Sequence, residues 1–383
     1  MKNLLKKRLT RREFLKSACF FCLGLGLSSS IVDLFSRIKA YAKEEDYYLH
    51  EARFYKKIDE KTVQCELCPR GCALTDGQRS FCRVREPRAG KLYSLAYGQA
   101  CAVHIDPIEK KPLFHFLPGT PIYSIATAGC NFRCKFCQNW SISQFPPEET
   151  YNQQLSPEEI VSETLKNRCP SIAYTYTEPS IFYEYMIDTA KLAKKYGIKN
   201  MYHSNGSINP KPAEELSLYL DAADVDLKAF TPQFYTDICA GYLETVLETL
   251  KILKRNGVWL EITNLVIPAL NDDLGKIKQM CIWIKENLGA DVPLHFSRFW
   301  PQYKLTHLLP TPVETLENAR TQAQEAGLNF VYIGNVPGHP AENTYCPKCK
   351  KPVIQRSGYS ILGNSLINGK CKFCGREIAG IWS

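Results

Sequence analysis

Between residues 121 and 334 the sequence alternates short apolar runs with longer amphipathic stretches. The apolar runs have the length of strands and the stretches between them the length of helices, which is typical of repeated strand–helix units around a parallel sheet. The expected strands are Ile122–Ala126, Ser171–Tyr174, Asn200–His203, Asp224–Leu227, Leu260–Val266, Pro293–Phe296 and Phe330–Ile333. We therefore predict an α/β fold with an open or closed barrel, whose chemistry gathers where the strands end.

Three of the expected helices carry end signals. The stretch from Ser156 to Arg168 begins with a capping serine, a proline at the first helical position and two glutamates. The stretches 181–196 and 243–256 are each followed by a glycine, which is the residue preferred just after a helix.

Three cysteines follow the first expected strand with the spacing C-x3-C-x2-C: Cys130, Cys134 and Cys137. Iron–sulfur cubes usually take four cysteine ligands. A cube held by three would keep one iron open to bind a small molecule and pass it an electron. We interpret the trio as the ligand set of a catalytic [4Fe-4S] cluster, with a structural zinc knuckle as the alternative.

A second cysteine group lies in the expected N-terminal module, residues 43–118. It consists of Cys65, Cys68, Cys72 and Cys82. Pro69 and Gly71 supply a tight turn, so the four thiols can converge on one metal site, and zinc and an auxiliary iron–sulfur cluster both fit the spacing. Cys101 and His104 are less favoured alternative ligands, and His115 is interpreted as a packed histidine in an apolar connector.

A third group ends the chain, in the expected module 337–383. Cys346, Cys349, Cys371 and Cys374 form two C-x2-C pairs, the pattern of a zinc ribbon with a structural role. The chain has 17 cysteines in all, and their grouping favours metal ligation over a disulfide framework. Cys169, Cys239 and Cys281 are isolated in the sequence and are expected to be buried thiols.

Residues 1–42 have the features of an export leader. A basic region precedes an apolar run that is too short to span a bilayer comfortably, and Thr10–Lys16 resembles the twin-arginine motif. Ala40-Tyr41-Ala42 looks like a cleavage site. We predict export by the twin-arginine route or membrane anchoring, with a cytoplasmic location as the alternative. No transmembrane span is expected in the mature chain. The net charge of +9 does not indicate a nucleic-acid surface.

Polar residues cluster at the ends of the expected strands. Beyond the cysteines, the candidates are Thr175 to Pro179, Ser204, Asn205, Asp224, Asp226, Lys228, Glu261, Asn264, His295 and Arg298. About half of them are expected to serve only as ordinary caps.

The trio, with aromatic Phe136 beside its last cysteine, resembles the signature of radical S-adenosylmethionine (SAM) enzymes. The resemblance to their activating-enzyme-like branch covers about residues 60–383. It is closest to the AmmeMemoRadiSam-system radical SAM enzymes, through the Cys-x-Leu-Cys-Pro-Arg-x-Cys start, the Tyr-Thr-x-Glu-Pro segment and the paired C-x2-C tail. It implies a partial (β/α) TIM-like barrel between residues 119 and 336.

The resemblance also implies roles for individual residues. Cys130, Cys134 and Cys137 would hold the [4Fe-4S] cluster, Phe136 would contact adenine, and Glu178 would meet the methionine amino group of SAM. Ser204 and Asn205 would approach the ribose or carboxylate of SAM, and Asp226 matches an acid of the fourth strand. Tyr176 and Thr177 stand where the family has two glycines, and His203 stands where many activating enzymes have an acid.

The implied activity is reductive cleavage of SAM to a 5′-deoxyadenosyl radical, which abstracts hydrogen from a substrate. Implied partners are SAM, an electron donor such as flavodoxin or ferredoxin, and a protein substrate if the enzyme is an activase. A small-molecule or lipid-like substrate is the second version. A non-enzymatic iron–sulfur or zinc electron carrier, or a nucleic-acid adaptor, is the alternative of a different class.

Overall fold

The computed structural model describes residues 49–383. The expected leader, with its twin-arginine motif, lies outside the described residues. Residues from His50 onward form one compact unit. Within the described part of the chain, no helix is long and apolar enough to cross a bilayer.

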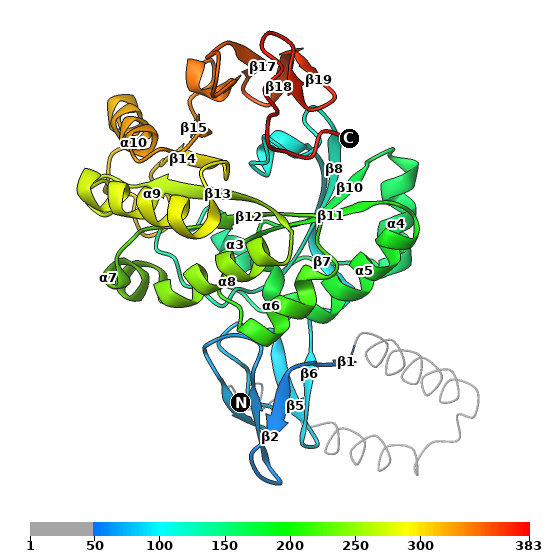
Figure 1. The fold of residues 1–383 in the computed structure, drawn as a ribbon. Helices are drawn as coiled ribbons and strands as arrows, with labels where there is room; N and C mark the ends of the chain where they lie inside the picture. Colours follow the sequence, from blue (N-terminus) through cyan, green and yellow to red (C-terminus); the bar gives the residue numbers. More distant parts are fainter. Residues whose placement is uncertain (1–48) are drawn as a thin grey trace, which may run out of the picture. The chain divides into compact units, whose positions relative to one another are not determined.

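A nine-stranded sheet forms the centre of this unit (Figure 1). Its order is β15-β14-β13-β12-β11-β10-β8-β7-β9. The seven strands from β8 to β15 along this order are parallel, and β7 and β9 add an antiparallel edge. The α/β class and the mostly parallel sheet predicted from the sequence are confirmed, and the open strand order is consistent with a partial barrel.

The strands of this sheet are β7 (Gln99–Pro107), β8 (Pro121–Thr127), β9 (Gln153–Gln154), β10 (Ser171–Tyr174), β11 (Lys199–Ser204), β12 (Ala222–Asp226), β13 (Trp259–Val266), β14 (Leu294–Arg298) and β15 (Val331–Gly334). The helices are α3 (Trp140–Ser143), α4 (Pro157–Lys166), α5 (Tyr183–Lys195), α6 (Pro210–Ser217), α7 (Pro232–Phe234), α8 (Leu243–Arg255), α9 (Leu274–Leu288) and α10 (Val313–Glu325). Short 3₁₀ turns are η1 (Ile108–Lys110), η2 (Pro147–Glu149), η3 (Pro179–Phe182) and η5 (Pro340–Glu342), and η4 (Tyr235–Cys239) is a π-helical turn.

Local chemistry explains the clearest of these elements. Helix α4 begins with a capping box, because the Ser156 side chain accepts from the Glu159 N–H and the Glu159 carboxylate accepts from the Ser156 N–H. Strands β8 and β10 are buried almost throughout, as expected for parallel strands with helices on one face. Figure 1 shows helices α4 to α10 alongside the sheet, and one continuous apolar core joins them to it.

The region before β8 is divided between two small antiparallel sheets and the central sheet. The first small sheet has the order β1-β6-β5, from β1 (His50–Glu51), β5 (Arg85–Arg88) and β6 (Lys91–Ser94). The second has the order β2-β3-β4, from β2 (Tyr55–Lys57), β3 (Thr62–Cys65) and β4 (Ala73–Thr75). Strand β7 leaves them to pair with β8, so the segment assigned to the N-terminal module contributes a strand to the central sheet.

The last segment forms two further sheets of short strands. They consist of β16 (Thr344–Tyr345), β17 (Pro352–Ser357) and β18 (Ser360–Asn364) in one, and β19 (Leu366–Ile367) and β20 (Lys370–Cys371) in the other. Phe114, Phe330 and Tyr332 pack against this segment in an apolar cluster of their own. His115 is fully buried there, between the Ala379 carbonyl and the Tyr332 hydroxyl, which fits its interpretation as a packed histidine.

Candidate functional site

Four neighbouring parallel strands bring the predicted site residues to one edge of the sheet. The trio follows β8, Glu178 follows β10, Ser204 and Asn205 stand at the end of β11, and Asp226 ends β12. Because β8, β10, β11 and β12 are adjacent and parallel, their carboxyl ends meet at this edge.

Glu178 is the centre of a buried hydrogen-bond network. One carboxylate oxygen accepts from the Ser180 N–H at 2.9 Å and from the Ser204 hydroxyl at 2.8 Å. The other accepts from the Asn205 N–H at 2.8 Å. Burial raises the pKa of Glu178, and these hydrogen bonds act in the opposite direction. The carboxylate thereby fixes the ends of β10 and β11 relative to each other.

Asn205 extends this network to the trio. Its side-chain N–H₂ donates to the Asn131 side-chain oxygen at 2.9 Å and lies 3.7 Å from the Cys130 sulfur. Its side-chain oxygen accepts from the Ser207 N–H, and Asn131 in turn donates to the Ser207 carbonyl. The structure therefore brings Glu178, Ser204 and Asn205 together with Cys130, as the strand ends suggested.

The three thiols of the trio have polar neighbours of different kinds. The Phe132 N–H donates to the Cys130 sulfur at 3.3 Å, and the Cys137 sulfur lies 3.2 Å from the Ser143 hydroxyl. A hydrogen bond with Cys239, together with burial, raises the pKa of Cys134 well above its ordinary value. Cys239 was expected only as an isolated buried thiol, so its position beside the trio is a finding that the sequence did not indicate.

Two further contacts hold the loop after β10 against the trio. Asn139 donates to the Tyr176 carbonyl at 2.7 Å, and the Thr177 hydroxyl donates to the Thr127 carbonyl at 2.8 Å. Tyr176 has a φ of 63°, a left-handed conformation that glycine adopts more easily. Its hydroxyl hydrogen-bonds to Asp106, which also pairs with Lys111, so a side-chain anchor holds the backbone in this conformation.

His203, Asp224, Asp226 and Lys228 form a charged cluster on and after strands β11 and β12. The His203 ring is 2.7 Å from one Asp224 oxygen, the other Asp224 oxygen accepts from the Thr263 hydroxyl at 3.0 Å, and Lys228 lies 2.7 Å from Asp226. Burial raises the pKa of Asp224 to about 6. His203, Asp224 and Asp226 are close enough to share a cation, and the Lys228 ammonium already supplies one positive charge beside Asp226.

The other strand residues proposed for substrate or SAM contact are occupied elsewhere. Glu261 accepts from the N–H groups of Phe114 and His115 and pairs with His295 at 2.7 Å, so it holds the connector before β8. Asn264 donates to the Leu227 carbonyl and lies against Met280 of α9, because it alternates with inward-facing Thr263 along β13. Arg298 donates to the Thr311 carbonyl.

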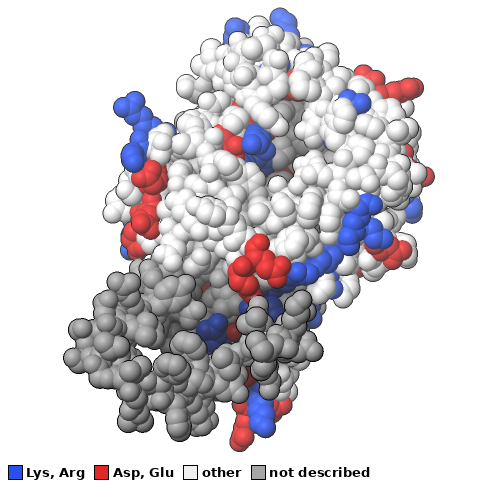
Figure 2. Space-filling view, turned by 180° about the vertical axis from the view of Figure 1, so that it is seen from behind, with Lys and Arg blue, Asp and Glu red and all other residues white. Residues whose placement is uncertain are grey.

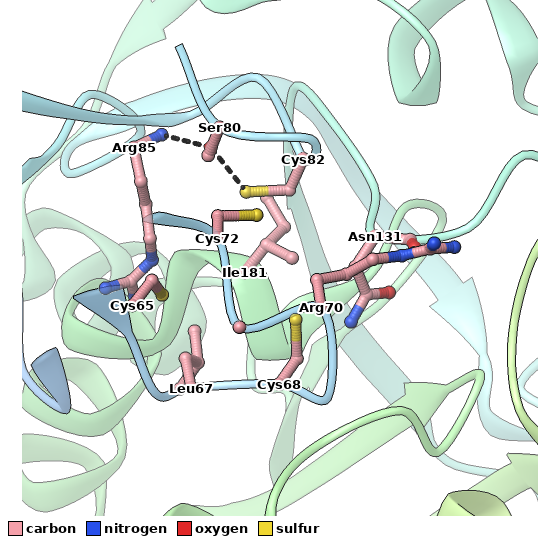
Figure 3. A pocket seen from close by; sticks show the side chains of 11 residues that line it. Cys65, Leu67, Cys68, Arg70, Cys72, Ser80, Cys82, Arg85, Asn131 and Ile181 are labelled. Carbon is pink, nitrogen blue, oxygen red and sulfur yellow. Dashed lines mark hydrogen bonds between the residues drawn. The ribbon is translucent and has the colours of Figure 1, made fainter. Parts of the chain in front are cut away.

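The N-terminal cysteines line a common small cavity (Figure 3). Cys65, Cys68, Cys72 and Cys82 all lie on its wall, with Arg70, Arg85 and Asn131 among the other lining residues. Cys101 and His104 belong to β7 and are not part of this wall.

The C-terminal cysteines converge much more closely. The sulfurs of Cys346, Cys349, Cys371 and Cys374 all lie within 4.8 Å of one another. Although burial acts to raise it, hydrogen bonds from the backbone N–H groups of Phe373 and Cys374 lower the pKa of Cys371 to about 7. Such a set of four thiols can bind a single metal ion.

Comparison with known proteins identifies the family. Residues 124–281 match the model of the radical SAM superfamily. Uncharacterized protein MJ0808 of Methanocaldococcus jannaschii is 48% identical over 332 residues, which cover 86% of this chain and 99% of that protein. The chain therefore belongs to the radical SAM superfamily of enzymes.

Two solved structures have more distant similarity. A radical SAM methyltransferase from Sphaerobacter thermophilus is 12% identical, with 75% of this chain and 78% of that chain covered and a TM-score of 0.48. A domain of pyruvate-formate lyase-activating enzyme from Bacteroides vulgatus is 17% identical, with 43% of this chain and 98% of that chain covered and a TM-score of 0.37.

Membership of this superfamily implies a [4Fe-4S] cluster and SAM. The residue types at the strand ends are suitable for binding a cluster and SAM. Cys130, Cys134 and Cys137 share one loop, and the Asn205 amide nitrogen lies 3.7 Å from the Cys130 sulfur. Figure 2 shows that one face of the described residues carries both acidic and basic side chains.

Proposed function

We propose that this protein is a radical SAM enzyme of the activating-enzyme-like branch, most similar to the AmmeMemoRadiSam-system enzymes. Cys130, Cys134 and Cys137 would hold the cluster. The observation that supports this best is the continuous chain of contacts from Glu178 through Asn205 to Cys130. When bound, the cluster and SAM supply a 5′-deoxyadenosyl radical that abstracts a hydrogen atom from the substrate.

Glu178 would both order the strand ends and contact SAM. A carboxylate has about four acceptor sites, and three hydrogen bonds from the chain occupy most of them. One site is left for a further donor, which suits the ammonium group of the methionine moiety. Ser204 and Asn205 would meet the ribose or carboxylate of SAM from the same edge.

Phe136 would contact the adenine. Its ring is buried and packs near Phe234, and the Lys228 ammonium lies 5.5 Å from the ring centroid. Lys228 in turn pairs with Asp226, so an ordered charged pair would form one wall beside the aromatic ring. Asp226 would act by holding Lys228 rather than by direct contact with SAM.

The substrate is proposed only as a class: a molecule or partner protein with a C–H bond that the radical attacks. Activation of a partner protein follows from the branch resemblance and is the version that we favour. The electron donor would be a flavodoxin or ferredoxin. The C-terminal quartet would hold a structural zinc ion, because four thiolates on one ion leave no position open for chemistry.

Residues 1–42 are proposed to direct export by the twin-arginine route or to anchor the chain, with cytoplasmic residence as the alternative. Cell fractionation of the wild type and of an Arg11→Lys, Arg12→Lys double variant distinguishes these. We expect the variant alone to stay in the cytoplasm, and a cytoplasmic location for both would contradict the export proposal.

The enzyme proposal is tested by anaerobic reconstitution of the full chain with iron and sulfide. We expect SAM to change the electron paramagnetic resonance (EPR) spectrum of the dithionite-reduced protein and 5′-deoxyadenosine to accumulate. The proposal would be overturned if SAM left the EPR spectrum of the reconstituted protein unchanged and no 5′-deoxyadenosine formed.

A further inference from the structure

We infer that Cys65, Cys68, Cys72 and Cys82 bind a second [4Fe-4S] cluster, which passes electrons to the cluster of the trio. The electron-transfer role rests on the proposed function, because the cluster of the trio is the electron acceptor. The presence of a second cluster does not depend on the proposed function. The evidence is the spacing of the four thiols, the charge around them and their contact with the trio loop.

Spacing separates this site from a zinc site. Four thiolates on one zinc ion lie about 3.8 Å apart, because each Zn–S bond is about 2.3 Å long and the geometry is tetrahedral. The C-terminal quartet satisfies this, with sulfur–sulfur distances of 3.5 and 3.7 Å for two of its pairs.

The N-terminal thiols have a wider arrangement. Among the described residues, they are not one of the groups whose ligand atoms lie within 4.8 Å of one another, and neither is the trio. In a cube each cysteine binds a different iron, so its sulfurs stand farther apart than on a single ion. Like the trio, the N-terminal quartet is therefore not gathered as closely as the C-terminal quartet, and Figure 3 shows its sulfurs spread around the cavity wall.

The cavity also carries positive charge with an unused hydrogen-bond donor. Arg85 is fully buried, and its guanidinium lies beside Cys65 (Figure 3). It pairs with Glu184 at 2.8 Å, but its Nε has no partner within the protein. Arg70 also lines the cavity, but its guanidinium extends away from the sulfurs and stacks on the Phe81 ring. A cluster held by four thiolates is anionic, and its sulfurs accept hydrogen bonds, so the unpaired Arg85 donor suits it.

The cavity lies directly against the loop that carries the trio. The Cys82 carbonyl is so close to Gly129 that an added Cβ would stand 2.4 Å from it, and Gly129 immediately precedes Cys130. Asn131, which follows Cys130, lines the cavity and accepts through its carbonyl from Arg70. Arg133 donates to the carbonyls of both Cys130 and Phe81. Cys82 of the N-terminal quartet therefore packs directly against Gly129, the residue next to Cys130 of the trio.

This arrangement suggests the direction of electron flow. A cluster with four cysteine ligands has no open iron for SAM, and electron transfer is the role that we propose for it. A low-potential one-electron donor of the flavodoxin or ferredoxin class would reduce it by one electron. The second cluster would return to its oxidised state when it passes that electron to the cluster of the trio. Reductive cleavage of SAM would then consume the electron.

The test measures the iron and sulfide content of variants, each of which retains only one of the two cluster sites. Anaerobically reconstituted wild type should contain about eight iron and eight sulfide per chain. A Cys130→Ser, Cys134→Ser, Cys137→Ser triple variant should keep about four iron, with an EPR signal that does not respond to SAM. A Cys65→Ser, Cys68→Ser double variant should also keep about four iron, with a signal that does respond. Cys101→Ser, outside the cavity wall, is the matched control and should keep the wild-type count.

The relay is tested by changing the reductant. The Cys65→Ser, Cys68→Ser variant should cleave SAM with dithionite but lose most turnover with reduced flavodoxin. Equal turnover with both reductants would overturn the relay, and zinc without iron in the triple variant would overturn the second cluster. Either failure is distinct from a failure of the proposed function, in which wild type with its iron bound forms no 5′-deoxyadenosine.

Discussion

The two cysteine quartets of this protein have the same number of ligands but different geometry. The C-terminal quartet converges within 4.8 Å and is formed by short hairpins at the chain end. The N-terminal quartet spreads around a cavity against the trio loop and has the fully buried Arg85 beside it. The number of cysteines therefore does not determine the cofactor, whereas sulfur spacing and charge distinguish a single ion from a cube.

The same two regions also attach to the sheet in different ways. A fully buried ion pair, Arg85 with Glu184 of α5, joins the N-terminal segment to the barrel. Apolar packing of Phe114, Phe330 and Tyr332, together with buried His115 and a hydrogen bond from buried Arg356 to the Phe114 carbonyl, joins the C-terminal segment. The difference predicts that loss of the Glu184 charge weakens the N-terminal attachment, whereas the C-terminal attachment depends on pH through His115.

The largest expected contrast is between a ligand of the trio and one of the C-terminal quartet. Cys134→Ala should abolish SAM cleavage, because the cube loses one of its three protein ligands. Cys371→Ala should chiefly lower stability, with a fall in Tm of about 5 °C or more as the structural metal is lost. Anaerobic 5′-deoxyadenosine assays and thermal unfolding measure the two effects. The reverse pattern would contradict the assignment of both sites.

A second prediction concerns the ion pair of the N-terminal segment. Glu184→Gln leaves the Arg85 charge buried without its partner, so the free energy of unfolding should fall by roughly 3–5 kcal/mol. Anaerobic urea unfolding of the reconstituted protein measures this. Glu51→Gln removes the exposed partner of Lys91 and should cost under about 1 kcal/mol. Equal losses for the two variants would show that the buried pair does not hold the segment.

A third prediction uses pH to examine the C-terminal attachment. Burial lowers the pKa of His115 to about 4, from an ordinary 6.5. Between these values the unfolded chain binds the proton more readily, so stability should rise with pH across the window and be complete above it. The contribution of His115 is roughly 3 kcal/mol.

The measurement is urea unfolding at several pH values between 4 and 7, for wild type and His115→Gln. The free energy of unfolding of wild type should increase relative to that of His115→Gln as the pH rises through this window, whereas the curve of His307→Gln, at an exposed position, should run parallel to wild type. Parallel curves for wild type and His115→Gln would contradict the role of His115. Asp224, whose pKa is raised from 3.8 to about 6, gives both proteins an opposite slope of similar size over this window, so the effect of His115 is obtained from the difference between the two curves.

Periodicity and spacing predicted the parallel strands and the trio because both are local properties of the chain. All seven expected strands overlap observed ones, and Ser156 caps α4 as its sequence indicated. Alternation along β13 could also have shown that Asn264 faces the helices, since Thr263 and Glu261 share the opposite face.

Contacts between distant segments could not be predicted in this way. Glu261 binds the backbone at Phe114 and His115, almost 150 positions earlier, so its burial reflects tertiary structure rather than a site. Strand β7 pairs with β8 although nothing in its sequence identifies the partner. The position of Cys239 depends on a π-helical turn that ends in left-handed Ala240.

The smallest predicted effect concerns Cys239, and it decides whether the trio really has three ligands. Its thiol hydrogen-bonds with Cys134. Hydrogen bonds to cluster sulfurs raise the reduction potential, so Cys239→Ala should lower the potential of the SAM-responsive signal in an EPR redox titration while its iron content stays unchanged. Cys281→Ala, a buried thiol in α9, is the matched control and should not shift the potential. Loss of iron in Cys239→Ala would instead make Cys239 a fourth ligand. The cluster of the trio would then have four cysteine ligands, like the proposed second cluster. This result would contradict the assignment of a catalytic role to the trio and an electron-transfer role to the N-terminal quartet.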